Sequence, residues 1–532
     1  MKKITILLAI LFITLFNSGC EDELMPYGPV SSMNFWKTEA DVNSALYAFG
    51  EYTFWEEMTG RGHFWYENCS DNMITGRVNA NADAYKNFTM TAGTGYLYEL
   101  WPRVFQLVAK TNDVLRNVPE MTDISPALKD RAIAEARFYR AYAYLWIAPW
   151  YGDTRSGGIP IITEDLTISE MDPPRPASVL ENYAMILEDF RAAADGLPSF
   201  SQLPDAEYGR PYKTVAWAFA ARAALYASQW DAAYLDVVIE MCDKVINLTG
   251  ADKRELYPDF TKLFTRENNF CSEYIFSMLG NRISGPKFHG MGFQNGGFGL
   301  FNTWGYFQPT AELYEAYPAG DVRRDATILV PGQHIQYIGA DIHWAVNPEG
   351  ISSPTGMTFR KFMSIFEAAD CIGTVVRPSG DDQSNELGTC IMRYADILLM
   401  KAEALIWKNG EGNATAKGLI NQILKRAGLP ENSTATKAEL KLQRRLELAY
   451  EFMPSRHFDL VRWGDAQAIY AQPQHGYGRP ASAADYADFS KWQANRIEVW
   501  QARTFDPVKN QVFPIPSNAI NSSANLKQNI GY

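Results

Sequence analysis

The sequence predicts an all-α dominated protein, a helical-repeat scaffold that carries a large irregular, loop-rich lobe. Over much of residues 35–250, and again from residue 391, apolar residues recur three and four positions apart. That spacing is typical of amphipathic helices. Residues 251–390 lose this period and are rich in glycine and proline. We therefore expect one body over residues 35–532, with an N-terminal helical part (35–250), a loop-rich lobe (251–390) and a C-terminal helical part (391–532).

The first helices follow from this period and from proline placement. Pro102 should lie near the start of its helix, where proline is tolerated, and Pro149 should end the next one. Ser125-Pro126 is a favourable N-cap and first-turn pair. Helices are expected over residues 41–51, 96–118, 126–148 and 178–194.

Small residues then indicate helix pairs that approach closely. Residues 214–248 place alanines along one helix and Trp230 at the turn into a second. Residues 392–426 repeat the pattern around Asn409-Gly410, and residues 437–460 are expected to add a third set. This arrangement resembles tetratricopeptide units, so the scaffold is expected to be tetratricopeptide-like.

The lobe shows only short strand-like runs, at residues 328–330, 335–338 and 374–377. A stretch of this length is too long for a simple loop in a compact body. Loops held by a rigid scaffold are where binding residues concentrate. We therefore expect the ligand site to include this lobe.

The first residues are typical of an export signal. Lys2 and Lys3 precede a run of thirteen residues without charge, 4–16, which is too short to span a bilayer. Cys20 follows two small residues, so residues 1–19 resemble a bacterial lipoprotein signal, with Asn17 as a departure. The expectation is a lipidated Cys20 and a tether over residues 20–34. Ordinary secretion with an incidental cysteine is the alternative.

Composition excludes several function classes. The net charge of −12 argues against a nucleic-acid binder, which needs a basic footprint. No Cys or His pair has zinc-ligand spacing, and the glycine-rich run 290–299 lacks the context of a dinucleotide site, so no metal or cofactor is expected. For the other five cysteines, one or two disulfides and buried free thiols both remain open.

Five segments in order resemble the SusD/RagB family of outer-membrane lipoproteins. They are FWKTEADVNSALYAFGEY (35–52), EARFYRAYAYLWIAPWYG (135–152), RYADILLMKAEA (393–404), RLELAYEFMPSRHFDLVRWG (445–464) and FPIPSNAINSSANLKQNIGY (513–532). The resemblance implies a non-enzyme at the cell surface. It would be held in the outer membrane by its lipid and would bind oligosaccharide or polysaccharide for a SusC-like TonB-dependent transporter. Some members of the family take peptide instead.

The charged residues of these segments are expected to carry the fold. Long charged side chains bury their stems between helices and pair their charges. We expect intramolecular ion pairs for Glu135, Arg137, Arg140, Arg393, Glu403, Arg456, Asp459 and Arg462.

Two aromatic segments are the candidates for a sugar site, because flat rings stack on the C–H face of a sugar and polar side chains bind its hydroxyls. Residues 62–76 hold three consecutive rings, of which at least one should be exposed. Residues 288–307 hold seven rings, six glycines and no charged residue. The expected glycan contacts are Trp65, Tyr66, Asp71, Arg77, Tyr96, Trp304, Tyr306 and Trp344.

Three alternatives stay open at this point. The rings of these loops can be buried under the loops themselves. A glycoside hydrolase needs two carboxylates about 5–10 Å apart, and 61 acidic residues allow such a pair although no short motif marks one. A peptide-binding or assembly module would use the grooves of the helical repeats.

Overall fold

The computed structural model describes residues 35–53, 56–59, 61–76, 78–95, 97–265, 268–278, 307–337, 340–343, 353–361, 389–453 and 455–532. The expected signal (1–19), the lipidation site Cys20 and the tether (20–34) lie outside the described residues. In the part that is described, no helix combines the length and the apolar character needed to cross a membrane.

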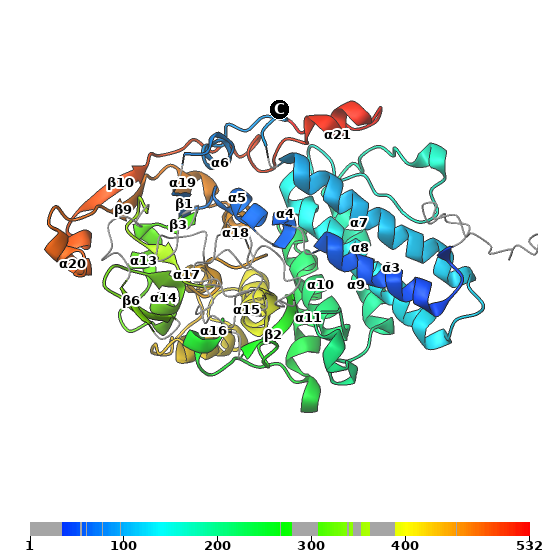
Figure 1. Cartoon of the computed structure of the whole chain (residues 1–532), viewed down its shortest axis with the longest axis horizontal. Helices are drawn as coiled ribbons and strands as arrows, with labels where there is room; N and C mark the ends of the chain where they lie inside the picture. Colours follow the sequence, from blue (N-terminus) through cyan, green and yellow to red (C-terminus); the bar gives the residue numbers. More distant parts are fainter. Residues whose placement is uncertain are drawn as a thin grey trace, which may run out of the picture.

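Four long helices form one side of the molecule (Figure 1). They match the four helices expected from the apolar period. The third runs on to Tyr151 instead of stopping before Pro149, because one proline near the last turn removes a single helical hydrogen bond and Gly152 then ends the helix. Pro102 lies in the second turn of its helix. The helices are α3 (Glu39–Thr53), α7 (Leu97–Asn117), α8 (Pro126–Tyr151) and α9 (Val179–Gly196).

Paired helices continue this scaffold into the second half of the chain. Helix α10 (Lys213–Ala227) packs between α9 and α11 (Tyr234–Ile246), and α11 contacts α15 (Tyr394–Asn409). Helix α15 then packs on α16 (Ala414–Arg426) and α17 (Lys437–Leu448). The alanines of α10 are buried, which lets its neighbours approach closely. This packing agrees with the expected helical-repeat scaffold.

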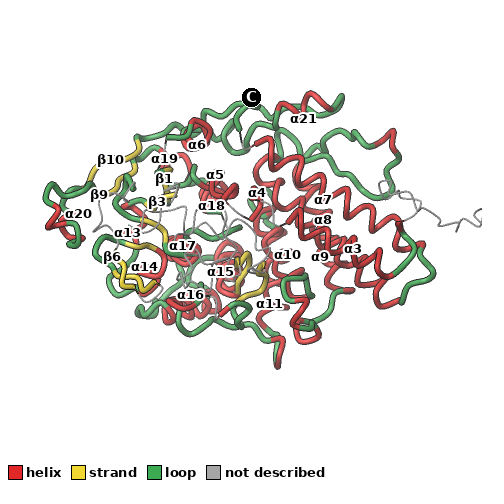
Figure 2. The backbone as a smooth tube through the Cα atoms, viewed as in Figure 1, coloured by secondary structure: helices red, strands yellow, loops and turns green. Residues whose placement is uncertain are grey.

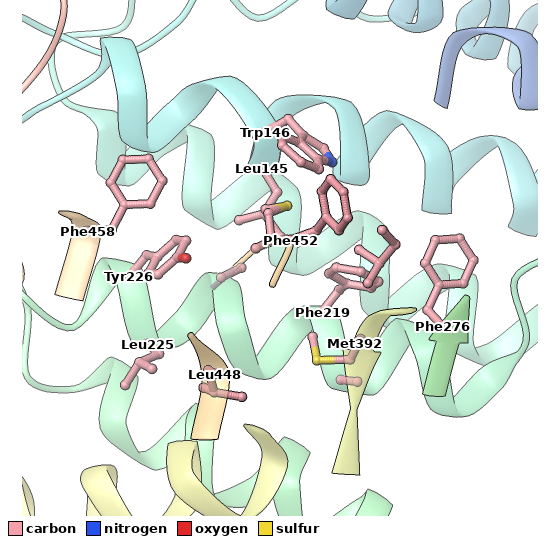
Figure 3. Packing of buried hydrophobic residues seen from close by; sticks show 14 of the residues in the cluster. Leu145, Trp146, Phe219, Leu225, Tyr226, Phe276, Met392, Leu448, Phe452 and Phe458 are labelled. Carbon is pink, nitrogen blue, oxygen red and sulfur yellow. The ribbon is translucent and has the colours of Figure 1, made fainter. Parts of the chain in front are cut away.

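A single hydrophobic cluster runs through both halves of the body. Figure 3 shows Trp146 of α8, Phe219 of α10, Phe276 of β2 (Tyr274–Met278) and Met392 of β8 (Thr389–Arg393) converging in it. Strands β2 and β8 pair antiparallel, so the ladder joins the start of the lobe to the C-terminal helices.

The described parts of the lobe contain small two-stranded sheets and short helices (Figure 2). Two of the three expected strand runs are confirmed, and the third, 374–377, lies outside the described residues. Sequence analysis did not predict the short helices at Ala311–Ala316 and Val322–Thr327. The elements are α13 (Ala311–Ala316), α14 (Val322–Thr327), β4 (Ile328–Leu329) paired with β7 (Thr358–Phe359), and β5 (His334–Tyr337) paired with β6 (Ala340–His343).

The C-terminal segment crosses the whole body. After α18 (Arg456–Trp463) and α19 (Ala466–Tyr470), β9 (Gln474–Tyr477) pairs with β10 (Arg496–Trp500) around α20 (Phe489–Gln493). This ribbon lies at the end of the molecule opposite α3 (Figure 1). The chain then returns to α7 through α21 (Ser517–Ser522).

The expected ion pairs are confirmed. They link segments far apart in sequence, as where Arg393 binds Glu273, Glu447 and Glu451. The others pair Glu135 with Arg210, Arg137 and Arg140 with Asp189, Arg462 with Glu403, Asp459 with Arg444, and Arg456 with Asp71.

The described cysteines are free thiols. Cys69, Cys242 and Cys390 are buried and Cys271 is half-buried, whereas Cys371 lies outside the described residues. Burial raises the pKa of the Cys69, Cys242 and Cys390 thiols well above the ordinary value. These three therefore behave as small core residues.

Candidate ligand-binding site

The two aromatic segments meet in a β-ladder that the sequence did not predict. Strand β1 (Met73–Thr75) pairs antiparallel with β3 (Phe307–Pro309), and Thr75 lies opposite Phe307. The side chain and backbone N–H of Thr310 donate to the carbonyl oxygens of Asp71 and Asn72, at 2.9 and 3.1 Å. Segments more than 200 residues apart in sequence are thus fixed side by side.

Helix α6 (Ala80–Lys86) joins this ladder to the loop before α7. Asn79 caps the helix by accepting hydrogen bonds from the N–H groups of Asn81 and Ala82. The Thr75 hydroxyl donates to Asp83 at 3.5 Å. On the other side, the N–H of Gly95 donates to Asn81 Oδ1 at 3.1 Å.

The Tyr85 hydroxyl completes this link by donating to the Gly95 carbonyl at 3.0 Å. A Cβ at position 95 would lie 2.4 Å from Asn81 Nδ2, so any larger residue there would displace the Asn81 amide that accepts the Gly95 N–H. The chain ends that lead into Arg77, Tyr96 and Tyr306 are therefore all held at the β1–β3 ladder and α6. Val78, next to Arg77, is 98% exposed.

Buried cations hold the turn beneath β1. Lys86 Nζ donates to the carbonyl oxygens of Ser70 and Met73, at 2.9 and 2.5 Å. Arg503 Nη1 donates to the carbonyls of Cys69 and Lys86, at 2.6 and 2.8 Å. Burial lowers the pKa of Lys86 well below its ordinary value. The floor of the candidate site is thus fixed from inside the body.

Trp65 and Tyr66 belong to the core, so the expectation of an exposed ring among the three at 64–66 is wrong. Trp65 is 3% exposed and Tyr66 1%. Trp65 packs edge-on against Phe307 with ring centroids 5.0 Å apart, and Tyr66 packs against Trp150 at the same separation. Trp65 and Tyr66 both lie on α5 (Arg61–Glu67). The described side chains of this helix are buried on every face, because other segments surround it. In this structure the two rings support the site from below.

Asp71 is likewise buried and paired within the protein. Its carboxylate lies 3.0 Å from Arg445 and 2.9 Å from Arg456. Burial alone would raise the pKa of Asp71, but the two arginines hold it below its usual range. This residue therefore fixes the 62–76 segment to α17 and α18.

The other expected contacts, Arg77, Tyr96, Trp304, Tyr306 and Trp344, lie outside the described residues. The structure describes the segments that flank them. Sequence analysis overlooked α6, which holds the described segments that flank Arg77 and Tyr96, although Asn79 is a preferred N-cap residue. Among the described residues, no three His, Cys, Asp or Glu side chains are grouped so that they could hold a metal ion.

The helical-repeat scaffold carries the candidate ligand site where the β1–β3 ladder, α6 and the loop before α7 meet. Residues 290–532 match the family model described as the SusD family. Residues 30–225 match a model described as starch-binding and associating with the outer membrane. The chain belongs to the SusD/RagB family.

Curated relatives and solved structures extend over nearly the whole chain. A SusD-like protein of Bacteroides ovatus is 25% identical over 492 residues, covering 86% of this chain and 82% of the relative. SusD-like protein P2 of Formosa agariphila is 25% identical over 509 residues, covering 87% and 91%.

Two solved structures share the fold. A SusD-like protein of Bacteroides fragilis superposes with a TM-score of 0.77 at 23% identity, covering 94% of this chain and 99% of its own. Surface glycan-binding protein A of Bacteroides thetaiotaomicron, in complex with laminarihexaose, has a TM-score of 0.70 at 19% identity, covering 92% and 99%.

Proposed function

We propose that this protein is a cell-surface glycan-binding lipoprotein. It captures an oligosaccharide or polysaccharide and delivers it to a partner SusC-like TonB-dependent transporter in the outer membrane. Acyl chains on Cys20 anchor it after removal of residues 1–19, and residues 20–34 tether the body. The alternative within the same family is a ligand that is a peptide or glycopeptide.

One observation carries the glycan assignment. The β1–β3 ladder and α6 hold together the chain ends that lead into Arg77, Tyr96 and the ring-rich segment before Phe307. The described flanks of segments that contain rings and polar groups, the groups that bind sugar faces and sugar hydroxyls, therefore lie side by side. The laminarihexaose complex of a protein with this fold supports the same ligand class.

Calorimetric titration with neutral and charged oligosaccharides, and with peptides of similar length, tests the proposal. Replacing Trp304 or Tyr96 by alanine should weaken binding of the best glycan at least about tenfold, because a stacked ring supplies about 1.4 kcal/mol or more. Trp217→Ala is the matched control, since this half-buried ring lies on α10, outside the candidate site. Unchanged affinity in both site variants would contradict the site, and binding of peptides alone would favour the alternative.

The anchor and the partner need their own experiment. Cys20→Ala should release the protein from the outer membrane, whereas Cys242→Ala, at a buried thiol, should leave it membrane-bound. Affinity purification from solubilised outer membranes should recover the transporter with the wild-type protein. Retention of Cys20→Ala in the membrane, or recovery without any transporter, would count against this part of the proposal.

A further inference from the structure

A hollow lies along the side of α7, away from the site at α6. It has a volume of about 510 Å³ and is bounded by α7, the segment 160–173 and the C-terminal segment around α21. Figure 1 shows α21 beside α7 on the same side of the molecule. Pockets for small ligands have volumes of about 300–1,000 Å³. The hollow can therefore hold a ligand of one or two sugar rings.

Its floor consists of rigid apolar groups. Trp101 and Phe105 lie one turn apart on α7, with ring centroids 5.3 Å apart. Trp101 is fixed from behind by Tyr151, whose ring meets it edge-on at 5.3 Å. Pro102 and Pro160 complete the floor. Trp101 is buried and Phe105 half-buried, so Phe105 is the ring of this floor that a sugar C–H face can meet, and Trp101 fixes it from behind without rearrangement.

The rim is polar and carries no cation among its described residues. Gln106, Asn518 and Ser522 are exposed at its edge. The one carboxylate among the lining residues, Asp172, already accepts from the Ser523 hydroxyl and the Ala524 N–H, at 2.5 and 2.8 Å. Among the described lining residues there is no lysine or arginine. Amides and hydroxyls without a cation suit the hydroxyls of a neutral sugar, whereas a phosphate, sulfate or uronate would lack a counter-charge.

The walls are held in place by polar contacts, some of which are buried. Arg175 Nη1 donates to Asn529 Oδ1 at 2.8 Å and to the Lys527 carbonyl at 3.0 Å. Asn529 Nδ2 donates to the carbonyls of Tyr151 and Phe513, at 3.0 and 2.7 Å. The C-terminal wall is thereby fastened to the end of α8, so the hollow exists before any ligand arrives.

We propose that this hollow, the α7–α21 groove, is a second carbohydrate-binding site that takes one or two units of a neutral glycan. It goes beyond the proposed function, because it is built from different residues than the site at α6. A protein with two sites holds a long glycan at two points, which raises its effective affinity through avidity.

Filling the groove tests the proposal. Ser522→Trp places a ring at an exposed rim position, while Ser522→Ala leaves the groove open and Lys110→Trp adds a ring to α7 outside it. Each variant is titrated with laminarihexaose, maltohexaose, xylohexaose, mannohexaose and hexagalacturonate. The best neutral probe should bind wild type and both controls at two sites and Ser522→Trp at one. Hexagalacturonate should not occupy the groove. Matching unfolding midpoints verify the fold.

Other outcomes overturn it. The groove is not a sugar site if Ser522→Trp keeps the wild-type stoichiometry, if hexagalacturonate competes there, or if no neutral probe binds there. A double variant, Trp304→Ala with Tyr306→Ala, separates this result from the proposed function. Loss of all binding in the double variant, with no effect of Ser522→Trp, would overturn the groove alone. Loss of binding in Ser522→Trp, with unchanged binding in the double variant, would overturn the α6 site alone.

Discussion

At the residue scale, Arg393 is the centre of the buried charge. Its Nε donates to Glu451 at 2.7 Å, and its Nη1 donates to Glu273 and Glu447 at 2.8 and 2.5 Å. Arg426 and Lys361 share the same acids. A buried carboxylate that loses its cation is costly, because it stays desolvated without compensation.

Arg393→Met should therefore lower the free energy of unfolding by about 3–5 kcal/mol. Arg191→Met is the matched control, since Arg191 and Glu240 are 3.7 Å apart and both are about half exposed. Such a surface pair contributes about 0–1 kcal/mol. Urea denaturation at neutral pH measures both, and equal losses would show that burial does not set the strength of these pairs.

Two buried histidines should make the protein sensitive to acid. Burial lowers the pKa of His63 and His457 to about 3, from 6.5 when unfolded. The unfolded chain then binds protons first, so stability is full above pH 6.5 and is lost as pH falls towards 3. Burial raises the pKa of Glu67 to about 7, which acts in the opposite sense between pH 4.5 and 7.

Between roughly pH 6 and 5, a falling pH lowers the free energy of unfolding through the two histidines and raises it through Glu67. The net result is a loss of about 1.4 kcal/mol per pH unit. His457→Gln removes one of the histidines and should flatten the profile in that window. Urea denaturation at half-unit steps of pH measures the slope. A slope in the variant as steep as in the wild type would assign the acid sensitivity to other groups.

At the element scale, long amphipathic helices could be predicted and short pairings could not. The apolar period and the placement of Ser125, Pro126 and Pro149 gave α3, α7, α8 and α9 within a few residues. No local sequence pattern predicts which segments pair in the β9–β10 and β1–β3 ladders. The three rings at 64–66 do point in different directions, but surrounding segments cover all of them.

Helix α6 provides a test of the element that gathers the site. Gly95→Ala forces its Cβ against the Asn81 amide, so this side chain must turn away and the loop before α7 loses the hydrogen bond from the Gly95 N–H that ties it to α6. We expect the free energy of unfolding to fall by about 1–3 kcal/mol, as it does at overpacked sites, and the affinity for glycan to weaken. Calorimetric unfolding and ligand titration measure the two effects.

Gly418→Ala is the matched control for this change. Gly418 is exposed within α16 and a Cβ there meets open space. Alanine in a helix interior should raise stability by about 0.5–1 kcal/mol and leave ligand binding unchanged. If both alanines had the same effect, the contact between Gly95 and Asn81 would not be what holds the loop.

At the scale of the whole molecule, function depends on contacts that only the folded chain makes. Sequence analysis found the two ring-rich segments, yet assigned Trp65, Tyr66 and Asp71 to a ligand because it could not see that α5 is enclosed. It missed the α7–α21 groove, since the lining residues lie more than 400 positions apart. The helical scaffold and the C-terminal segment bring together the residues that form each of the two sites.

The central claim is that a glycan binds where the β1–β3 ladder, α6 and the loop before α7 meet. A crystal structure of the complex with the tightest-binding oligosaccharide tests it most directly. We expect a sugar ring stacked on Trp304, Tyr306 or Tyr96, with hydroxyls near Arg77, while Trp65 and Tyr66 stay buried. A ligand lodged between the helices α8–α11, with none of these residues in contact, would contradict the account.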